Sequence, residues 1–71
     1  MRERVGEKLK TLRLKYGLTT RQLAEQFGTT NSQISRIENG LRQPSGDFLV
    51  KMSDFFNVSL DQLMRDDLDL D

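Results

Sequence analysis

The sequence predicts an all-α domain of about five short helices. Its apolar residues recur at spacings of three and four, which is the period of an amphipathic helix. Three segments carry a Ser or Thr followed three residues later by Gln, the signature of an N-terminal capping box. No run alternates apolar and polar residues as a half-buried strand would. The length of 71 residues fits one domain.

The first helix is predicted to end at Gly17. Val5, Leu9, Leu12 and Tyr16 form a single apolar stripe at helical spacing. Gly17 follows this stripe directly and ends the helix, because glycine readily takes the left-handed conformation found just after helices.

Two helices of about eight residues are predicted next, each with its own capping box. Thr19 and Gln22 begin the first of them, and Thr30 and Gln33 begin the second. A glycine follows each helix and ends it. The predicted buried residues are Leu23, Ala24 and Phe27 before Gly28, and Ile34 and Ile37 before Gly40.

A fourth helix is predicted over residues 47–56, "DFLVKMSDFF", after a loop that holds the only Pro. Ser59 and Gln62 form the third capping box and begin a short fifth helix. Residues 1–65 are therefore predicted to form the domain and residues 66–71 an acidic tail. The predicted inward residues of the fourth helix are Leu49, Met52 and Phe56, and the fifth helix carries Leu60, Leu63 and Met64.

Composition argues against an enzyme. The chain has no Cys and no His, which removes disulfides, thiolate metal sites and His-dependent nucleophiles. So short a chain also has little room for a deep, water-excluding cleft. We expect no catalytic residue, metal or cofactor. No apolar run approaches the ~20 residues that span a bilayer, so a cytoplasmic protein without membrane association is expected.

The net charge of zero conceals an asymmetry along the chain. Residues 1–44 hold nine Lys or Arg against four Glu, a net charge of +5. Residues 45–71 hold two Lys or Arg against seven Asp, a net charge of −5. Such a division indicates one half suited to a polyanion and another suited to a different task.

The second and third helices form a predicted helix-turn-helix. They are joined by a turn of roughly three residues that starts at Gly28, and such pairs cross at a steep angle. Ala24 is small enough to allow close approach, and Gly28 permits the sharp exit. Ile34 and Ile37 anchor the third helix and leave its opposite side free.

The free side of this third helix carries side chains that read base edges in DNA. Arg pairs with guanine, Asn or Gln with adenine, and Ser with several bases. A solvated polar face is the alternative, but the segment lacks the Glu/Lys pairs typical of one. We predict a recognition helix at about residues 30–38, with base contacts from Asn31, Ser32, Gln33, Ser35 and Arg36.

From Val5 to Leu63 the sequence resembles the phage repressor/Cro-type (Xre-type) helix-turn-helix DNA-binding family. The segments that carry the resemblance are "LKTLRLKYGLT", "QLAEQFGTT", "ISRIENG" and "FFNVSLDQL". It implies a compact five-helix bundle of the lambda-repressor-like type that binds a double-stranded DNA operator, usually as a two-fold dimer. A bacterial or phage-encoded protein is expected.

The resemblance also implies contacts with the DNA backbone. Thr20 occupies a phosphate-contacting position at which relatives often carry the longer Gln. Asn39 and Arg42 match backbone-anchoring positions after the recognition helix, and Arg21 lies beside the recognition element. For Arg21 and Arg42 a solvated charge is the alternative. The expected phosphate contacts are Thr20, Arg21, Thr30, Asn39 and Arg42.

Other matched positions concern structure. Arg13 and Glu38 correspond to a pair that forms an internal salt bridge in relatives. Gly46 stands where relatives often carry a larger residue, and Thr29 where they carry an aliphatic one. Three lysines of the first helix are expected to face solvent, and these are Lys8, Lys10 and Lys15.

The C-terminal half carries more apolar side chains than one small core needs, which indicates a protein interface. The alternative is that Phe48 and Phe55 fold back onto the core. Leu68 and the Asp residues of the tail complete this half. The expected homodimer interface comprises Phe55, Val58, Leu60, Leu63 and Met64.

Two functions follow from these observations. The first is a sequence-specific transcriptional regulator, a repressor, that binds a palindromic operator as a homodimer. The second is a protein-interaction module, such as an antitoxin or adaptor, that uses the acidic, apolar C-terminal half. A restriction-modification controller, control by a partner protein and a domain of a longer repressor also stay open.

Overall fold

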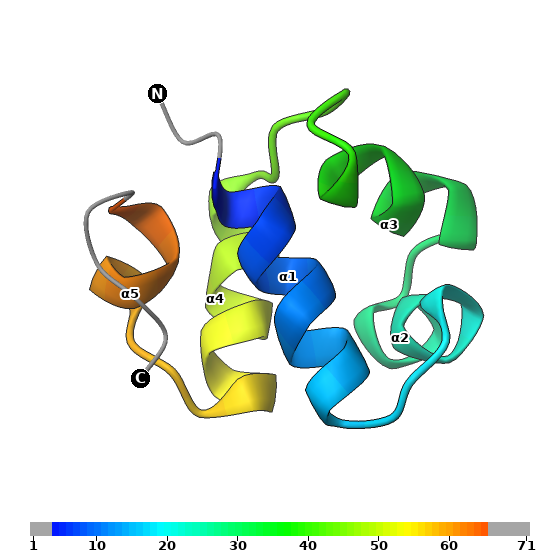
Figure 1. Ribbon diagram of the computed structural model, residues 1–71, viewed down its shortest axis with the longest axis horizontal. Coiled ribbons are helices and arrows are strands. Elements are labelled where there is room, and N and C mark those ends of the chain that lie inside the picture. Colours follow the sequence, from blue (N-terminus) through cyan, green and yellow to red (C-terminus); the bar gives the residue numbers. More distant parts are fainter. Residues whose placement is uncertain (1–3, 66–71) are drawn as a thin grey trace.

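The structure is a computed structural model that describes residues 4–65, and within that range it contains five helices and no strand (Figure 1). The predicted all-α, five-helix fold is therefore confirmed, whereas the predicted acidic tail at residues 66–71, with Leu68, lies outside the described residues. The helices are α1 (Arg4–Lys15), α2 (Thr20–Phe27), α3 (Asn31–Glu38), α4 (Gly46–Phe56) and α5 (Leu60–Met64).

Two of the three predicted capping boxes are complete. In α2, the Gln22 backbone N–H donates to Thr19 Oγ1 at 3.0 Å, and Thr19 N–H donates to Gln22 Oε1 at 2.9 Å. Ser59 and Gln62 repeat both bonds at α5. Each box gives partners to backbone donors that the first turn of a helix leaves free.

The box predicted at α3 is only half formed. Gln33 N–H donates to Thr30 Oγ1 at 3.2 Å. Among the described residues, the Gln33 side chain does not return a bond to the Thr30 backbone. The pattern of residue types is the same as at α2, so the difference arises from what surrounds Gln33 in the folded chain.

A single core joins the helices, and most of the predicted inward residues lie in it. One member of the predicted apolar stripe of the first helix is exposed, which is Tyr16 at 49%. Tyr16 lies past the end of α1, packs its ring edge-on to Phe56 and donates its hydroxyl to the Phe56 carbonyl at 3.2 Å. The core comprises Val5, Leu9, Leu12, Leu23, Ala24, Phe27, Ile34, Ile37, Leu49, Met52, Phe56 and Leu63.

Gly6 is the residue at which α1 passes the end of α3. A Cβ atom added there would lie 2.2 Å from the Ile37 carbonyl oxygen and 3.0 Å from that of Glu38. Only glycine allows this approach, because both obstructing atoms belong to the backbone. The sequence pattern did not single out Gly6.

The expectation that Lys8 faces solvent is wrong. Its side chain is buried, with the residue 2% exposed, and its ammonium donates to the carbonyl oxygens of Gln62 and, at 2.7 Å, Arg65. A cation near the C-terminus of a helix stabilises the last carbonyl groups, so Lys8 joins α1 to α5. Lys10 and Lys15 are exposed, as expected.

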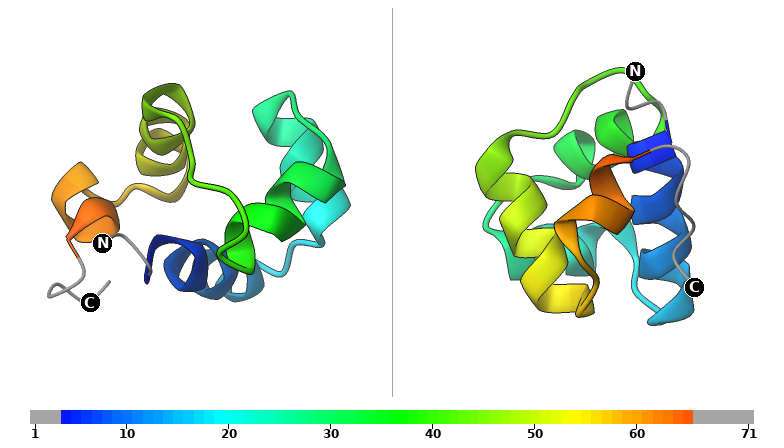
Figure 2. Two further views of the ribbon diagram at one scale, coloured as in Figure 1. Left: turned by 90° about the horizontal axis from the view of Figure 1, so that it is seen from above. Right: turned by 90° about the vertical axis from the view of Figure 1, so that its left-hand side faces the viewer.

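The five helices are spread along the long axis of the molecule. In the views of Figures 1 and 2, α2 and α3 lie at one end of the long axis and α5 at the other, with α1 and α4 between them. In the part of the chain that the structure describes, no helix has the length and apolar character needed to cross a membrane.

Candidate nucleic-acid interface

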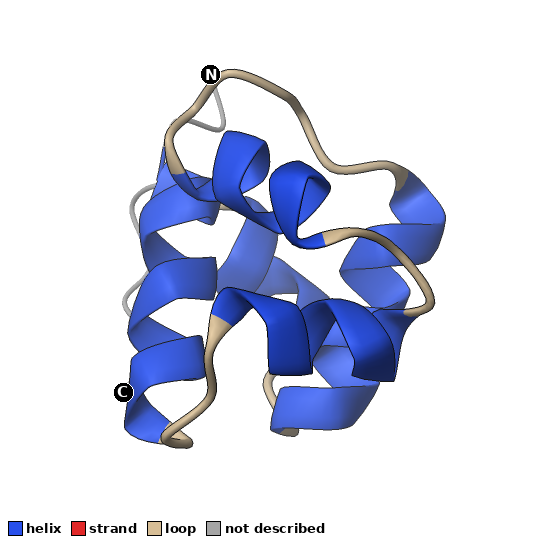
Figure 3. Ribbon diagram, turned by 90° about the vertical axis from the view of Figure 1, so that its right-hand side faces the viewer, coloured by secondary structure: helices blue, strands red, loops and turns tan. Residues whose placement is uncertain are grey.

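The helix-turn-helix forms one end of the molecule. Figure 3 shows α2 and α3 nearest the viewer, with no other described helix in front of them. In Figure 1 α2 is seen nearly end-on and α3 from the side, so their axes cross steeply. Gly28 takes φ +68° at the end of α2 and donates its N–H to the Ala24 carbonyl. This left-handed residue starts the turn that the sequence predicted.

Arg13 and Glu38 form the predicted salt bridge, and it holds α3 against α1. Arg13 Nε lies 2.6 Å from Glu38 Oε2, and a second guanidinium nitrogen donates to Glu38 Oε1 at 3.1 Å. The remaining nitrogen donates to the Leu18 carbonyl at 2.8 Å. The two side chains are only 10% and 5% exposed. Such a bidentate geometry fixes orientation as well as distance.

The outward side of α3 is polar and open. Asn31, Ser32, Ser35 and Arg36 are all exposed, while Ile34 is fully buried on the opposite side. Among the described residues, no hydrogen bond engages the side chains of Asn31, Ser32 or Arg36. Four of the five predicted base-contacting residues thus share one accessible face.

Gln33 differs from the other four. It is half-buried and lines a cleft of about 240 Å³ between α3 and the loop that follows it. Its Oε1 atom is buried and has no hydrogen-bond partner in the described chain. Gln33 lies at the flank of the outward face, where the loop from α3 to α4 covers that edge of the helix, and its base contact stays a prediction. Thr29, Arg42, Pro44 and Phe48 also line this cleft.

The residues expected to contact phosphate lie on α2, at the two caps of α3 and in the loop after it. Arg21, Thr30, Asn39 and Arg42 are exposed, and Thr20 is half-buried. The Asn39 amide donates to the Ser35 carbonyl at 2.9 Å and so caps α3. The phosphate contacts themselves stay predictions.

Two residues near this end were missed by sequence reasoning. Leu41, in the loop after α3, is 77% exposed. Lys51 of α4 donates its ammonium to the Phe27 carbonyl at 3.0 Å and so stabilises the end of α2. No local signal identifies Lys51, because its partner lies in a distant helix.

A second group of accessible apolar side chains lies on α4, α5 and the turn between them. Phe55 is 36% exposed and Leu60 39%, while Val58 and Met64 are half-buried. Leu63 is fully buried within the chain, so its assignment to a dimer interface is wrong. The buried side of a five-residue helix must face its own domain, and Leu63 occupies that side.

The alternative prediction, that Phe48 and Phe55 fold back onto the core, is also partly met. Phe55 packs edge-on to Phe27, with ring centroids 5.5 Å apart, while part of its ring stays exposed. Phe48 is half-buried and packs edge-on to Phe27 at 5.2 Å. Phe48 thus belongs to the core margin, and Phe55 serves both the core and the surface.

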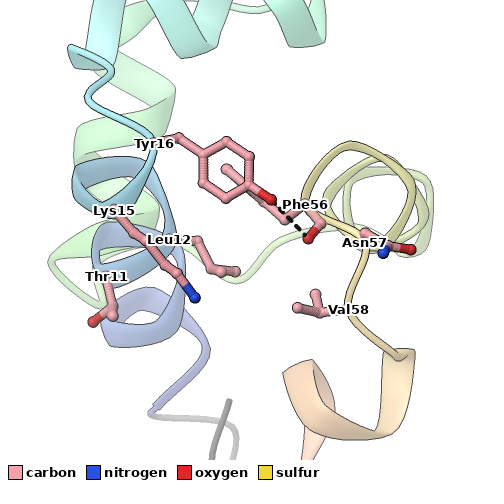
Figure 4. A pocket seen from close by; sticks show the side chains of 7 residues that line it. All are labelled: Thr11, Leu12, Lys15, Tyr16, Phe56, Asn57 and Val58. Atoms are coloured by element: carbon pink, nitrogen blue, oxygen red, sulfur yellow. Dashed lines mark hydrogen bonds between the residues drawn. The ribbon is translucent and has the colours of Figure 1, made fainter. Parts of the chain in front are cut away.

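A cleft of about 600 Å³ lies beside this second group of side chains (Figure 4). Side chains of α1 and of the turn between α4 and α5 line it. Asn57 takes φ 56° there, the one left-handed residue other than glycine in the described chain. The lining residues are Thr11, Leu12, Lys15, Tyr16, Phe56, Asn57 and Val58.

Comparisons with known proteins agree on one family. The family model described as "Helix-turn-helix" matches residues 9–63. The chain is 38% identical over 63 residues to the HTH-type transcriptional regulator ImmR of Bacillus subtilis, covering 89% of this chain and 50% of ImmR. It thus spans about half the length of that relative.

Two solved structures share the fold. The P22 c2 repressor in complex with a synthetic operator has a TM-score of 0.81 and 28% identity, covering 89% of this chain and 96% of that one. The N-terminal DNA binding domain of SinR from Bacillus subtilis has a TM-score of 0.81 and 33% identity, covering 92% and 96%.

Proposed function

Because the chain belongs to the helix-turn-helix family of Xre/Cro-C1 type, whose members are DNA-binding transcription regulators and not enzymes, we propose that it regulates transcription by reading a DNA operator with α3. The observation that carries this proposal is the open polar face of α3 on a rigidly held helix-turn-helix. A similar domain in the P22 c2 repressor is seen with its operator.

The residue types on α3 suit the major groove. This groove admits a helix, and residues near the N-terminal end of a recognition helix reach base edges. Asn31 can pair with adenine and Arg36 with guanine in two-bond contacts. The short side chains of Ser32 and Ser35 allow the backbone of α3 to come close to the bases.

We assign the residues around α3 to the phosphates. Exposed Arg21 and Arg42 supply charge, and exposed Thr30 and Asn39 supply hydrogen-bond donors. Half-buried Thr20 reaches less far and makes the weakest of these contacts. These contacts set the register of α3 in the groove without reading sequence.

We propose a homodimer on a palindromic operator, with half-sites about one helical turn (~34 Å) apart. Exposed Phe55 and Leu60, flanked by Val58 and Met64, form the proposed contact. These residues belong to α4, α5 and the turn between them and not to α3, so we expect a second copy bound there to leave the outward face of α3 free. Occupancy of the operator would repress transcription in the cytoplasm, as the similarity to a repressor supports.

A second candidate function rests on the same apolar surface. A protein-interaction module, such as an antitoxin or adaptor, would use Phe55 and Leu60 for a different protein. A partner protein bound there could equally control a regulator's dimerisation. The two candidates differ in whether α3 selects a DNA sequence.

Two measurements test the proposal. Selection of bound DNA duplexes from a random pool shows whether α3 selects a sequence, and the mass of the protein in solution shows whether the chain forms a dimer. We expect a palindromic consensus and a mass of two chains. Leu60→Asp should give a folded single chain with weaker operator binding. Leu14→Asp, at a residue 58% exposed on α1, is the matched control and should leave the dimer intact. No enriched sequence at low salt would favour the protein-interaction module.

A further inference from the structure

Three helices begin with a Ser or Thr followed three residues later by Gln, and only in α3 does the Gln side chain leave the capping box open. Gln22 and Gln62 each fold back to accept a hydrogen bond from the N-cap backbone, at 2.9 and 3.0 Å. Gln33 holds the same third position in α3 but turns away from Thr30. Local sequence favours the capping box at all three sites. The difference at Gln33 therefore comes from its tertiary surroundings, which are the cleft that it lines.

The cleft accommodates the Gln33 side chain but leaves its amide oxygen without a hydrogen-bond donor from the described chain. The side chain lines the cleft of about 240 Å³ beside Pro44 and Phe48, both half-buried. Its Oε1 atom is buried there without a donor from the described chain. A buried acceptor without a protein donor raises the free energy of the folded protein, so this position is a poor one for an amide.

The helix gives Gln33 a short path out of the cleft. Residues three and four apart are neighbours on a helix surface, so Gln33 adjoins both Arg36 and Ile37. Ile37 is 4% exposed and belongs to the core, whereas Arg36 is exposed on the outward face. A change of side-chain rotamer therefore moves the Gln33 amide from the loop side to the outward face without moving α3.

We propose that Gln33 is a specificity-determining residue with two positions. In the free protein its amide lies in the cleft beneath the loop from α3 to α4. In the complex it leaves the cleft, joins the outward face beside Arg36 and hydrogen-bonds an adenine through N6 and N7, the pairing that suits an amide. This inference rests on the proposed function, and it adds a base contact that the free structure conceals.

The substitution Gln33→Met tests this proposal. Met keeps the length and flexibility of the side chain and removes the amide. We expect stability that is equal or higher, affinity about tenfold lower for each half-site, and loss of adenine preference at one position of each half-site, as befits one two-bond base contact per copy. The matched control is Gln22→Met, which should lower stability and leave base preference unchanged, because it removes a closed capping box.

Nuclear magnetic resonance gives an independent readout. The Gln33 side-chain amide should show cross-relaxation with Pro44 and Phe48 in the free protein and lose it in the complex. Retention of that signal in the complex, or its absence from the free protein, would overturn the proposal. A Gln33→Met variant with the affinity and consensus of the parent chain would also overturn the proposal. If the parent chain selects no sequence at all, the proposed function fails; if parent and Met variant select the same palindrome, only this inference fails.

Discussion

Gly6 shows how much a single residue can decide in a chain of this size. Its missing side chain lets α1 pass the carbonyl end of α3, where an added Cβ would lie 2.2 Å from a backbone oxygen. Because α3 is the proposed recognition helix, this contact also sets the position of the DNA-reading face.

We predict that Gly6→Ala lowers the free energy of unfolding by about 1–3 kcal/mol, since the helices must separate to admit the methyl group. Gly46→Ala is the matched control. An added Cβ there meets no atom within 4 Å, so stability should rise by about 0.4–1 kcal/mol. Urea denaturation of both variants measures the difference, and equal stabilities would contradict this account of Gly6.

The buried pair of Arg13 and Glu38 gives a second prediction. Glu38→Gln leaves the guanidinium buried without its carboxylate and should cost about 3–5 kcal/mol of stability. Replacing both residues with Met should recover much of that loss, because no buried charge is then left alone. A double-mutant cycle of Arg13→Met, Glu38→Met and the double variant, followed by urea denaturation, measures the coupling. Additive effects of the two changes would show that the pair does not act as a unit.

Of the proposed DNA contacts, Arg36 should contribute most directly to the recognition of a particular base sequence. We expect Arg36→Ala to weaken operator binding by about 1–3 kcal/mol per half-site and to relax the preference at one base pair of each half-site. Arg21→Ala, at a proposed phosphate contact, should weaken binding about equally on all sequences. Affinity measurements on operator variants distinguish the two, and a uniform loss for Arg36→Ala would remove its base-reading role.

At the scale of the helix, α5 is too short to be stable alone. Its five residues are held by a closed capping box at one end and by the Lys8 ammonium at the other. The cation comes from α1, so α5 depends on an element more than fifty positions earlier in the chain.

We predict that Lys8→Met lowers stability by about 2 kcal/mol, because the terminal carbonyl groups of α5 lose charged hydrogen bonds. Amide hydrogen exchange should speed up in α5 before it does in α2 and α3. The control is Lys10→Met, at an exposed lysine of the same helix, which should change neither quantity. Unaltered exchange in α5 would contradict the role given to Lys8.

At the scale of the whole molecule, charge is divided unequally along the chain. The net charge of +5 in residues 1–44 includes the whole helix-turn-helix, and the net charge of −5 belongs to residues 45–71. We expect the positive charge of residues 1–44 to draw the helix-turn-helix toward the phosphates of DNA.

This arrangement predicts a steep dependence of operator affinity on salt. Each phosphate that a cation neutralises contributes about −0.9 to the slope of log affinity against log salt. Arg21→Ala and Arg42→Ala should therefore each make the slope shallower by about one per protein copy on the DNA. Glu25→Ala, an exposed acid on α2, is the opposite control and should not make it shallower. Slopes unaffected by either arginine would rule out these phosphate contacts.

The sequence by itself determined the helices and the motif. Capping residues, glycine ends and apolar spacing are local properties, so they located α2, α3 and α5 and the outward placement of Asn31, Ser32, Ser35 and Arg36. The Arg13–Glu38 bridge was also predicted, but only through resemblance to a family in which the two positions meet.

Only the tertiary structure decided the environments of Gly6, Lys8, Gln33 and Leu63. Each of the four depends on what a distant segment places against it: the end of α3, the end of α5, the loop after α3, and the shared core. Local pattern specifies which residues a helix turns toward its neighbours. It does not specify how closely those neighbours approach, because that distance results from the packing of all five helices together.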